Sequence, residues 1–334
     1  MSSLLERPVA EAGRRASVRR WLLGATNRGV VALYVVAVVL LACTRLVGTR
    51  SGSASDVRTV LSLATLTALV GFGQGLVVLT GGFDLSVPAT MTLAAVVLTG
   101  VTQGLSSHAP AAVLLVLGIG TLIGLVNGLV VTVARTSPVI VTLATNSVVE
   151  GAALVSSGGQ PTGSAPAVIT KAAVGGFSGG ALVALVVVLL AFLILGTAVT
   201  AKMARGRTLQ PAAMGARPPA LASTCRRSTI VGAYVLSGVS AAIGGLLLAG
   251  FRGQSYLSIG DPYLLLSLAA VMVGGASATG GRGLFLGTVA GAIVLQALST
   301  MLGGARLGGP LQDIVFAVAI LVAAVLARGR RQPT

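Results

Sequence analysis

The sequence predicts an all-α, polytopic membrane protein with about ten transmembrane helices. Of its 334 residues, 54% are hydrophobic and only 9% are charged, whereas soluble domains carry roughly a quarter charged residues. The polar surface that would coat a water-soluble globule is therefore missing, and lipid must solvate most of the chain. The apolar residues also fall into stretches of about 20, the length that crosses ~30 Å of hydrocarbon.

Taken in order, the chain predicts a basic tail at 1–28, a transmembrane domain at 29–327 and a second basic tail at 328–334. Each span is delimited by polar, Gly-rich or Pro-rich connections. Nine or eleven spans are alternatives to ten. The ten predicted spans are residues 29–46, 59–80, 85–105, 110–134, 138–156, 181–200, 229–250, 263–279, 283–302 and 310–327.

Basic residues cluster beside the apolar spans rather than over one surface. Of the 23 Lys and Arg, six lie in 1–29, six in 201–228 and three after Ala327. Such clusters are typical of cytoplasmic segments, and ten spans place all three on the same side. We therefore expect both termini to be cytoplasmic. Aromatic residues make up only 4% of the chain, so few side chains could stack on bases, and nucleic-acid binding is not expected.

Residues 79–89 interrupt two apolar stretches and are expected to concentrate function. The pair Gly81-Gly82 ends a helix because glycine accepts left-handed backbone angles. Asp84 or Ser86 can then accept the free N–H groups of a new helix that carries Pro88 in its first turn. Such a break at membrane depth is unusual. For Asp84, a structural cap and a functional charge are equally weighted alternatives.

Two further places combine polar residues or glycines with apolar flanks. A second break is predicted at Gly274, Gly275, Gly280 and Gly281. The sequence there resembles a phosphate-binding loop, but Gly281-Arg282 stands where that motif needs Gly-Lys followed by Ser or Thr. Within the span 138–156, Thr145, Asn146, Ser147 and Glu150 form a polar patch. These side chains either line a pathway or hydrogen-bond to neighbouring helices.

Glycine recurs at every fourth residue in two of the predicted spans. This spacing lines one helix face and lets backbones approach closely. It favours tight packing within the chain over a subunit interface. The six glycines are Gly120, Gly124 and Gly128 in one span and Gly283, Gly287 and Gly291 in the other.

The sequence gives little support for an enzyme. The single histidine, His108, falls in a short loop without a Cys or carboxylate partner nearby in sequence, and Cys43 and Cys225 lie far apart. No catalytic residue, cofactor site or metal site is therefore predicted. The polar residues at 156–180 predict a loop or a short re-entrant turn outside the cytoplasm.

Several motifs, in order along residues 57–327, resemble the ribose-type permeases, which are membrane subunits of ABC importers for simple sugars. The family signature Gly-Gly-Ile-Asp-Leu-Ser-Val is similar to Gly81-Gly82-Phe83-Asp84-Leu85-Ser86-Val87 here. The family's Pro-Phe-Ile-Val-Thr-Leu-Gly-Thr is similar to the stretch from Pro138 to Thr145. Later matches are Gly158-Gly159-Gln160-Pro161, Tyr234-Val235-Leu236-Ser237-Gly238 and residues 269–288, which hold the second glycine break.

The resemblance implies a type II ABC importer-like permease bundle in a bacterial inner or plasma membrane. It implies three protein partners: a second permease chain, identical or similar, a cytoplasmic ABC ATPase and an extracytoplasmic solute-binding protein. ATP would be hydrolysed on the ATPase. The pathway and hinge candidates are Gly81, Gly82, Phe83, Asp84, Ser86, Thr145, Asn146, Glu150, Gly274, Gly275, Gly280 and Gly281. An ion-coupled secondary transporter that uses Asp84 or Glu150 as its proton site is the alternative, and a membrane scaffold that transports nothing is a third.

The cytoplasmic loop 201–228 is the expected contact with the ATPase. The family carries Gly-x-Asn-Pro-x-Ala-Ala in its coupling helix, and the counterpart here runs from Gly215 to Ala222, with Arg217 in place of Asn. Pro88 also departs from the family, where glycine is usual. The coupling candidates are Gly206, Arg207, Gly215, Arg217, Pro218, Ala220 and Ala222.

Overall fold

A computed structural model of the chain describes residues 26–43, 54–174, 220–276, 285–304 and 309–329. Within these ranges all regular secondary structure is helical. The elements are α2 (Thr26–Cys43), α3 (Ala54–Leu79), α4 (Val87–Thr102), the short 3-10 helix η1 (Ser106–His108), α5 (Ala109–Val133), α6 (Pro138–Ser156), α7 (Ala167–Ala173), α9 (Ala220–Arg252), α10 (Pro262–Val273), α11 (Phe285–Gly304) and α12 (Gly309–Gly329).

The helices match the predicted spans closely, with two exceptions. Five of the described helices are long and apolar enough to cross a membrane, and four shorter ones are apolar, so the chain is a polytopic helical membrane protein. Helix α9 begins at Ala220, nine residues before the predicted span, and takes in Arg226 and Arg227. Helix α10 ends at Val273 rather than at 279. The predicted span 181–200 lies outside the described residues.

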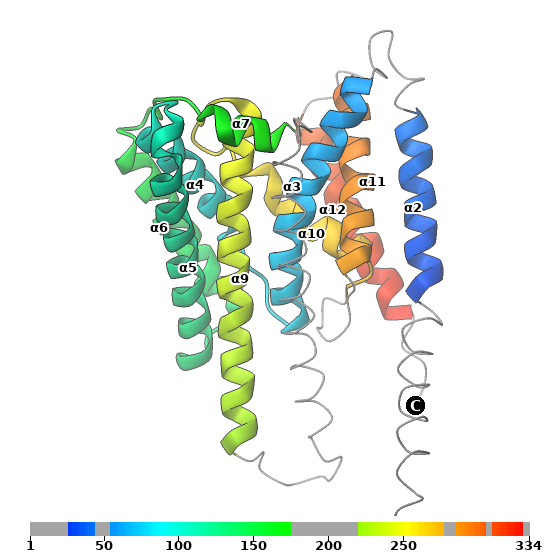
Figure 1. Ribbon diagram of the computed structural model, residues 1–334. Helices are drawn as coiled ribbons and strands as arrows, with labels where there is room; N and C mark the ends of the chain where they lie inside the picture. The colour runs from blue at the N-terminus through cyan, green and yellow to red at the C-terminus, as the bar shows by residue number, and fades with distance from the viewer. Residues whose placement is uncertain (1–25, 44–53, 175–219, 277–284, 305–308, 330–334) are drawn as a thin grey trace, which may run out of the picture.

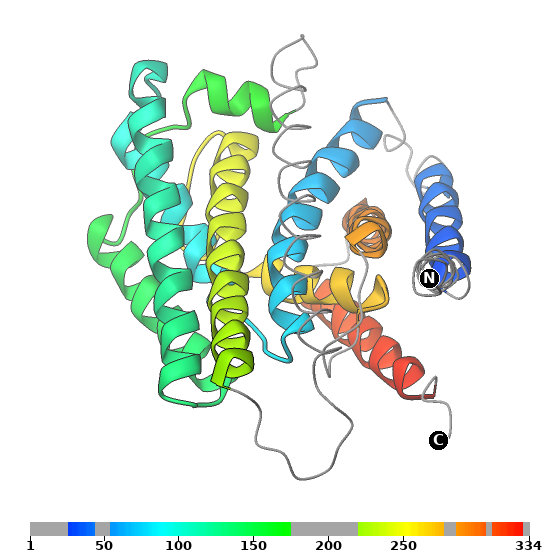
Figure 2. The ribbon, with the colours of Figure 1, turned by 60° about the horizontal axis from the view of Figure 1, so that its bottom comes forward.

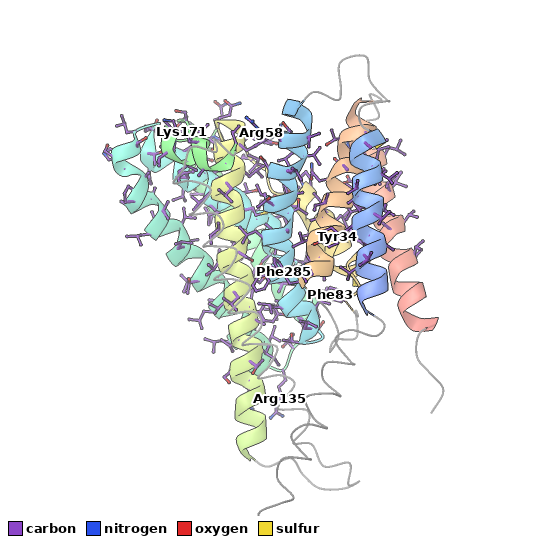
Figure 3. All side chains as sticks on the ribbon, turned by 45° about the vertical axis from the view of Figure 1, so that its right-hand side comes forward. Tyr34, Arg58, Phe83, Arg135, Lys171 and Phe285 are labelled. Atoms are coloured by element: carbon purple, nitrogen blue, oxygen red, sulfur yellow. The ribbon has the colours of Figure 1, made fainter. Side chains whose placement is uncertain are left out.

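Helix α9 stands between two groups of helices and contacts α3, α4, α5 and α7 (Figure 1). In Figure 2, helices α4, α5 and α6 lie on one side of α9, α2 and α11 lie beyond α3 on the other, and α10 crosses α3 between the two groups. Helix α3 joins the groups because it contacts α9, α10 and α11. Figure 3 labels Arg135 at one end of the bundle, and Lys171 and Arg58 at the other. We call these ends the Arg135 face and the Lys171 face.

The glycines that recur at every fourth residue in α5 and α11 form two rows, here called the glycine stripes. The described members of both stripes pack against other helices of the same chain. Cβ atoms added to Gly120, Gly124 and Gly128 would meet the backbone of α9, and those on Gly287 and Gly291 would meet the backbone of α10 and of Gly274, which follows it. Close backbone approach of this kind suits helices in lipid, where dispersion contacts replace the hydrophobic effect as the driving force. The two stripes are thus filled by neighbouring helices of the same polypeptide; Gly283 lies outside the described residues.

Candidate functional site

The first glycine break is a hydrogen-bonded end of helix α3. Gly81 has φ +87°, a left-handed angle that glycine adopts readily. Its N–H donates to the carbonyl of Val78 at 2.9 Å, and the N–H of Gly82 donates to the carbonyl of Val77 at 3.2 Å. This pair of bonds is the Schellman motif. A Cβ on Gly82 would stand 2.6 Å from the hydroxyl oxygen of Tyr234, so this position also needs glycine for space.

The described part of the second break, at the end of α10, repeats this geometry. Gly275 has φ +94°, its N–H donates to Met272 at 3.0 Å, and the N–H of Ala276 donates to Val271 at 3.1 Å. The two helix ends meet in one buried cluster of Val78, Val271 and Ala276, against which Phe83 and Leu268 pack. Residues from two distant sequence positions thus form one paired structure. Gly280 and Gly281 lie outside the described residues.

The non-helical stretch 80–86 is here called the glycine joint. Its backbone carbonyls accept hydrogen bonds from side chains of three helices. The carbonyl of Phe83 accepts hydrogen bonds from the hydroxyls of Thr142 in α6 at 3.4 Å and Tyr234 in α9 at 3.5 Å. The carbonyl of Asp84 accepts one from Nε2 of Gln74 in α3 at 3.2 Å. These contacts replace the water that is missing at membrane depth.

The carboxyl of Asp84 begins a chain of side-chain hydrogen bonds. Its Oδ1 accepts from the backbone N–H of Ser86 at 3.0 Å and from the Ser86 hydroxyl at 2.6 Å. Nδ2 of Asn127 donates to Ser86 Oγ at 2.9 Å, and the hydroxyl of Thr145 donates to Asn127 Oδ1 at 2.7 Å. The joint is thereby tied to α5 and α6. Asp84 is only 1% exposed.

The start of α4 is capped from another helix. Ser86 is the N-cap residue, but its side chain makes no capping bond; its hydroxyl instead donates to Asp84 and accepts from Asn127. Pro88 has no N–H to satisfy, and the N–H of Ala89 donates to Oδ1 of Asn146 in α6 at 3.3 Å. Asp84 therefore positions the N-cap residue rather than capping the helix itself.

Two buried polar side chains stand beside the joint. Oε1 of Gln74 has no hydrogen-bond partner among the described residues, and the hydroxyl of Ser237 lies next to the Asp84 carboxyl. Gln74 is 0% and Ser237 1% exposed. The joint thus has spare hydrogen-bonding capacity beyond its bonds to Ser86.

Helix α6 buries one narrow face and exposes the rest. Its buried residues are Val141, Thr142, Val149 and Ala153. Thr145 and Asn146 are half-buried, and Ser147 and Glu150 are exposed. Glu150 therefore does not belong to the Asp84 chain. A carboxylate is costly in lipid, so the exposed face of α6 requires water or protein beside it.

Sequence reasoning missed a second non-helical stretch, residues 253–261 between α9 and α10, here called the α9–α10 segment. The predicted spans 229–250 and 263–279 left these residues between them without any assignment. In the structure, Ser255 Oγ and Thr99 Oγ1 lie 2.6 Å apart, and the N–H of Gly260 donates to Thr92 Oγ1 at 3.1 Å, so the segment follows α4. Glycines at both ends of a Ser-containing stretch, with Asp261-Pro262 after it, were the available signal.

Most of the coupling candidates lie outside the described residues, namely Gly206, Arg207, Gly215, Arg217 and Pro218. Ala220 and Ala222 belong to the first turn of α9. His108 ends η1 and is exposed, as the loop prediction requires. The polar segment at 156–180 contains turns and the seven-residue helix α7.

Residues 57–325 match the family model described as branched-chain amino acid transport system / permease component. The chain is 32% identical to the galactofuranose transporter permease protein of Escherichia coli strain K12 over 81% of its own length and 79% of that protein. It is 31% identical to the ribose import permease protein of Bacillus subtilis strain 168 (82% and 84%) and 30% identical to the fructose import permease protein of Rhizobium meliloti (85% and 80%). No solved structure matches.

Proposed function

This chain belongs to the family of branched-chain amino acid transport system permease components, and from that premise we propose that it is the membrane subunit of an ABC importer for a simple sugar. The observation that carries the proposal is similarity to sugar permeases over four-fifths of the chain. The glycine joint and α6 both fall inside the matched residues. Ribose, galactofuranose and fructose, the sugars in the relatives' names, indicate the solute class.

We place the Arg135 face in the cytoplasm. Helices α2 and α9 begin, and α12 ends, at the lower side of Figure 1, which is the side of Arg135 in Figure 3. The three basic clusters adjoin these helix ends in sequence, and basic residues beside spans favour the cytoplasmic side. The Lys171 face then receives solute from an extracytoplasmic binding protein.

The ATPase acts on the glycine joint through α9. The coupling candidates directly precede or begin this helix, and Tyr234 and Ser237 of α9 lie at the joint. Movement of α9 would therefore reach the stretch that links α3 to α4, and through Asn127 and Thr145 it would reach α6. Rocking of packed helices around such joints is a general mode of alternating access.

A second copy of the chain, or a similar permease, faces the exposed side of α6. Glu150 and Ser147 need a polar environment there, and a solute path between two copies supplies it. Sugars are neutral and rich in hydroxyls, so hydroxyl and amide groups suffice for recognition. The burial and hydrogen bonding of Asp84 fit this proposal better than a proton site that must exchange with water.

Transport in membrane vesicles tests the proposal against a secondary transporter. The permease, its ATPase and its binding protein should accumulate a labelled simple sugar only when ATP is supplied, and a proton uncoupler should leave uptake intact. Uptake without ATP that collapses with the uncoupler would refute the ABC mechanism. Identifying the ligand of the binding protein encoded alongside would then name the sugar.

The coupling site has its own test. Ala220→Glu should lower sugar-stimulated ATPase activity and uptake together, because a charge at the first turn of α9 disturbs the contact with the ATPase. Ala167→Glu is the matched control, since Ala167 also begins a helix but lies in α7 at the opposite face. If Ala220→Glu, at normal membrane abundance, keeps wild-type sugar-stimulated ATPase activity and uptake, the ATPase contact does not lie at the start of α9.

A further inference from the structure

The α9–α10 segment descends into the membrane beside α4. Gly260 bonds to Thr92, and a Cβ on Gly260 would meet the carbonyl of Pro88. Thr92 precedes Thr102, the last residue of α4, by ten residues, or about 15 Å along the helix axis. The segment therefore reaches from the Lys171 face to roughly the middle of the ~30 Å hydrocarbon layer.

Helix α10 begins at this depth and is too short to span the layer. Its 12 residues cover about 18 Å, and its far end meets the glycine joint through Val271. Irregular backbone therefore replaces helix over the outer half of this crossing. At membrane depth such backbone is tolerated only where it is enclosed by protein or lines a water-filled cavity.

Exposed side chains distinguish these two alternatives. Asp261 is exposed and Ser258 belongs to the same turn, whereas Ser255 and Ile259 are buried. Asp261 is the N-cap residue of α10, yet its side chain makes no capping bond, so capping does not explain the carboxylate. Ser258 has φ +64°, an uncommon angle for a residue with a side chain. A carboxylate at this depth cannot face lipid without a large cost.

The segment also packs against the buried face of α6. Leu257 packs against the buried cluster that includes Val149 and Ala153 of α6. The segment is therefore held against α4 and the buried face of α6, while Ser258 and Asp261 stay exposed.

We propose that the α9–α10 segment lines a water-filled entrance that opens at the Lys171 face, and that Ser258 and Asp261 contact the solute there. The solute-contact part rests on the proposed import function, whereas the water-filled entrance does not. A carboxylate that only accepts hydrogen bonds suits the hydroxyl groups of a sugar. Asp261 and Ser258 are thereby assigned to recognition, beyond the residues that the glycine motifs indicate.

Cysteine labelling tests the entrance independently of transport. In a chain carrying Cys43→Ala and Cys225→Ala, we would introduce Ser258→Cys and add a charged, membrane-impermeant thiol reagent to the outside of right-side-out vesicles. Reactivity of a thiol requires access to water and ionisation to thiolate. Ser258→Cys should react at least about tenfold faster than either of two control variants, Leu122→Cys and Leu257→Cys.

The two control cysteines show how fast the reagent reacts at a position that faces lipid and at one that is packed against protein. Leu122 lies in α5 at a position that is 60% exposed on an apolar surface, so Leu122→Cys is the lipid control. Leu257 lies in the same segment as Ser258 but packs against the buried cluster of α4, α5 and α6, so Leu257→Cys is the protein-packed control. If Ser258→Cys reacts no faster than Leu122→Cys, the segment does not face water and the proposal is wrong. A fold defect would show as loss of membrane abundance; Asp261→Cys, labelled under the same conditions, then decides the question.

Substitution of Asp261 tests solute contact. Asp261→Asn keeps the shape but removes the charge, and we expect it to lower kcat/KM for sugar uptake about tenfold with normal abundance and unchanged labelling of Ser258→Cys. Asp313→Asn, an exposed acid in α12, is the matched control and should transport normally. Full transport by Asp261→Asn would refute the solute contact while leaving import intact; absence of sugar uptake by the wild-type importer would refute import while the labelling result stands.

Discussion

The glycine joint and the α9–α10 segment are both non-helical, and both end beside Pro88, but they satisfy their polar groups in different ways. In the joint, carbonyls of Phe83 and Asp84 and the side chain of Ser86 are bonded by four helices of the chain. In the segment, the carboxylate of Asp261 makes no capping bond and is exposed. Irregular backbone at membrane depth can therefore be sealed by protein or opened to water, and this bundle uses both solutions.

The difference separates two tasks. A sealed joint can transmit movement because each displacement of α9 or α6 must break or shift a specific hydrogen bond. An open segment can meet a hydrated solute because the side chains of Ser258 and Asp261 are exposed. Gly260 of the segment packs against Pro88, two residues after the joint, so a change at this contact should affect both regions.

The largest expected effect is at that contact. Gly260→Ala places a methyl group against the Pro88 carbonyl and 2.9 Å from Met91 Cβ, and backbone cannot rotate away as a side chain can. We expect a loss of about 3 kcal/mol or more in stability, measured as a lower Tm of the purified protein. Gly253→Ala, with φ +78° and open space around it, should lose only about 1 kcal/mol. Equal Tm values for the two variants would contradict the close contact.

The next effect concerns the hydrogen-bond chain of the joint. Asn127→Leu leaves the Thr145 hydroxyl without its acceptor and Ser86 Oγ without its donor, which should cost about 2 kcal/mol and strongly reduce transport. Thr121→Val in the same helix is the control, because the Thr121 hydroxyl donates only to its own helix, at Leu117. If both variants transport alike at matched abundance, α5 does not couple the joint to α6.

Much of this fold could be predicted from the sequence because lipid imposes strong length and polarity constraints. The spans followed from apolar run length, and the end of α3 followed from Gly81-Gly82. The partners of the joint could not be predicted, since Ser86, Asn127 and Thr145 belong to separate elements and only packing brings them together. The α9–α10 segment was missed because its polar residues are as typical of an ordinary outer loop as of a stretch beside α4.

A smaller effect is expected at the cap that α6 provides for α4. Asn146→Ala removes the acceptor for the Ala89 N–H, a bond of 3.3 Å, and loss of a cap costs about 1 kcal/mol. Asn146→Asp retains an acceptor oxygen and should stay closer to wild type in Tm. The reverse order of these two variants would mean that the amide group has a role other than capping.

The smallest effect is expected from the residue at the centre of the joint. In the Asp84→Asn variant, the remaining side-chain oxygen can accept both bonds from Ser86, and the new NH₂ group can donate to the neighbouring hydroxyl of Ser237. We therefore expect transport within about twofold of wild type, because neither of the existing bonds to Ser86 requires a charge. Asp84→Leu, which removes both acceptors, should lose transport. A proton-coupled carrier that used Asp84 would instead lose transport in both variants. Normal transport by Asp84→Asn would therefore show that this carboxyl only stabilises the glycine joint.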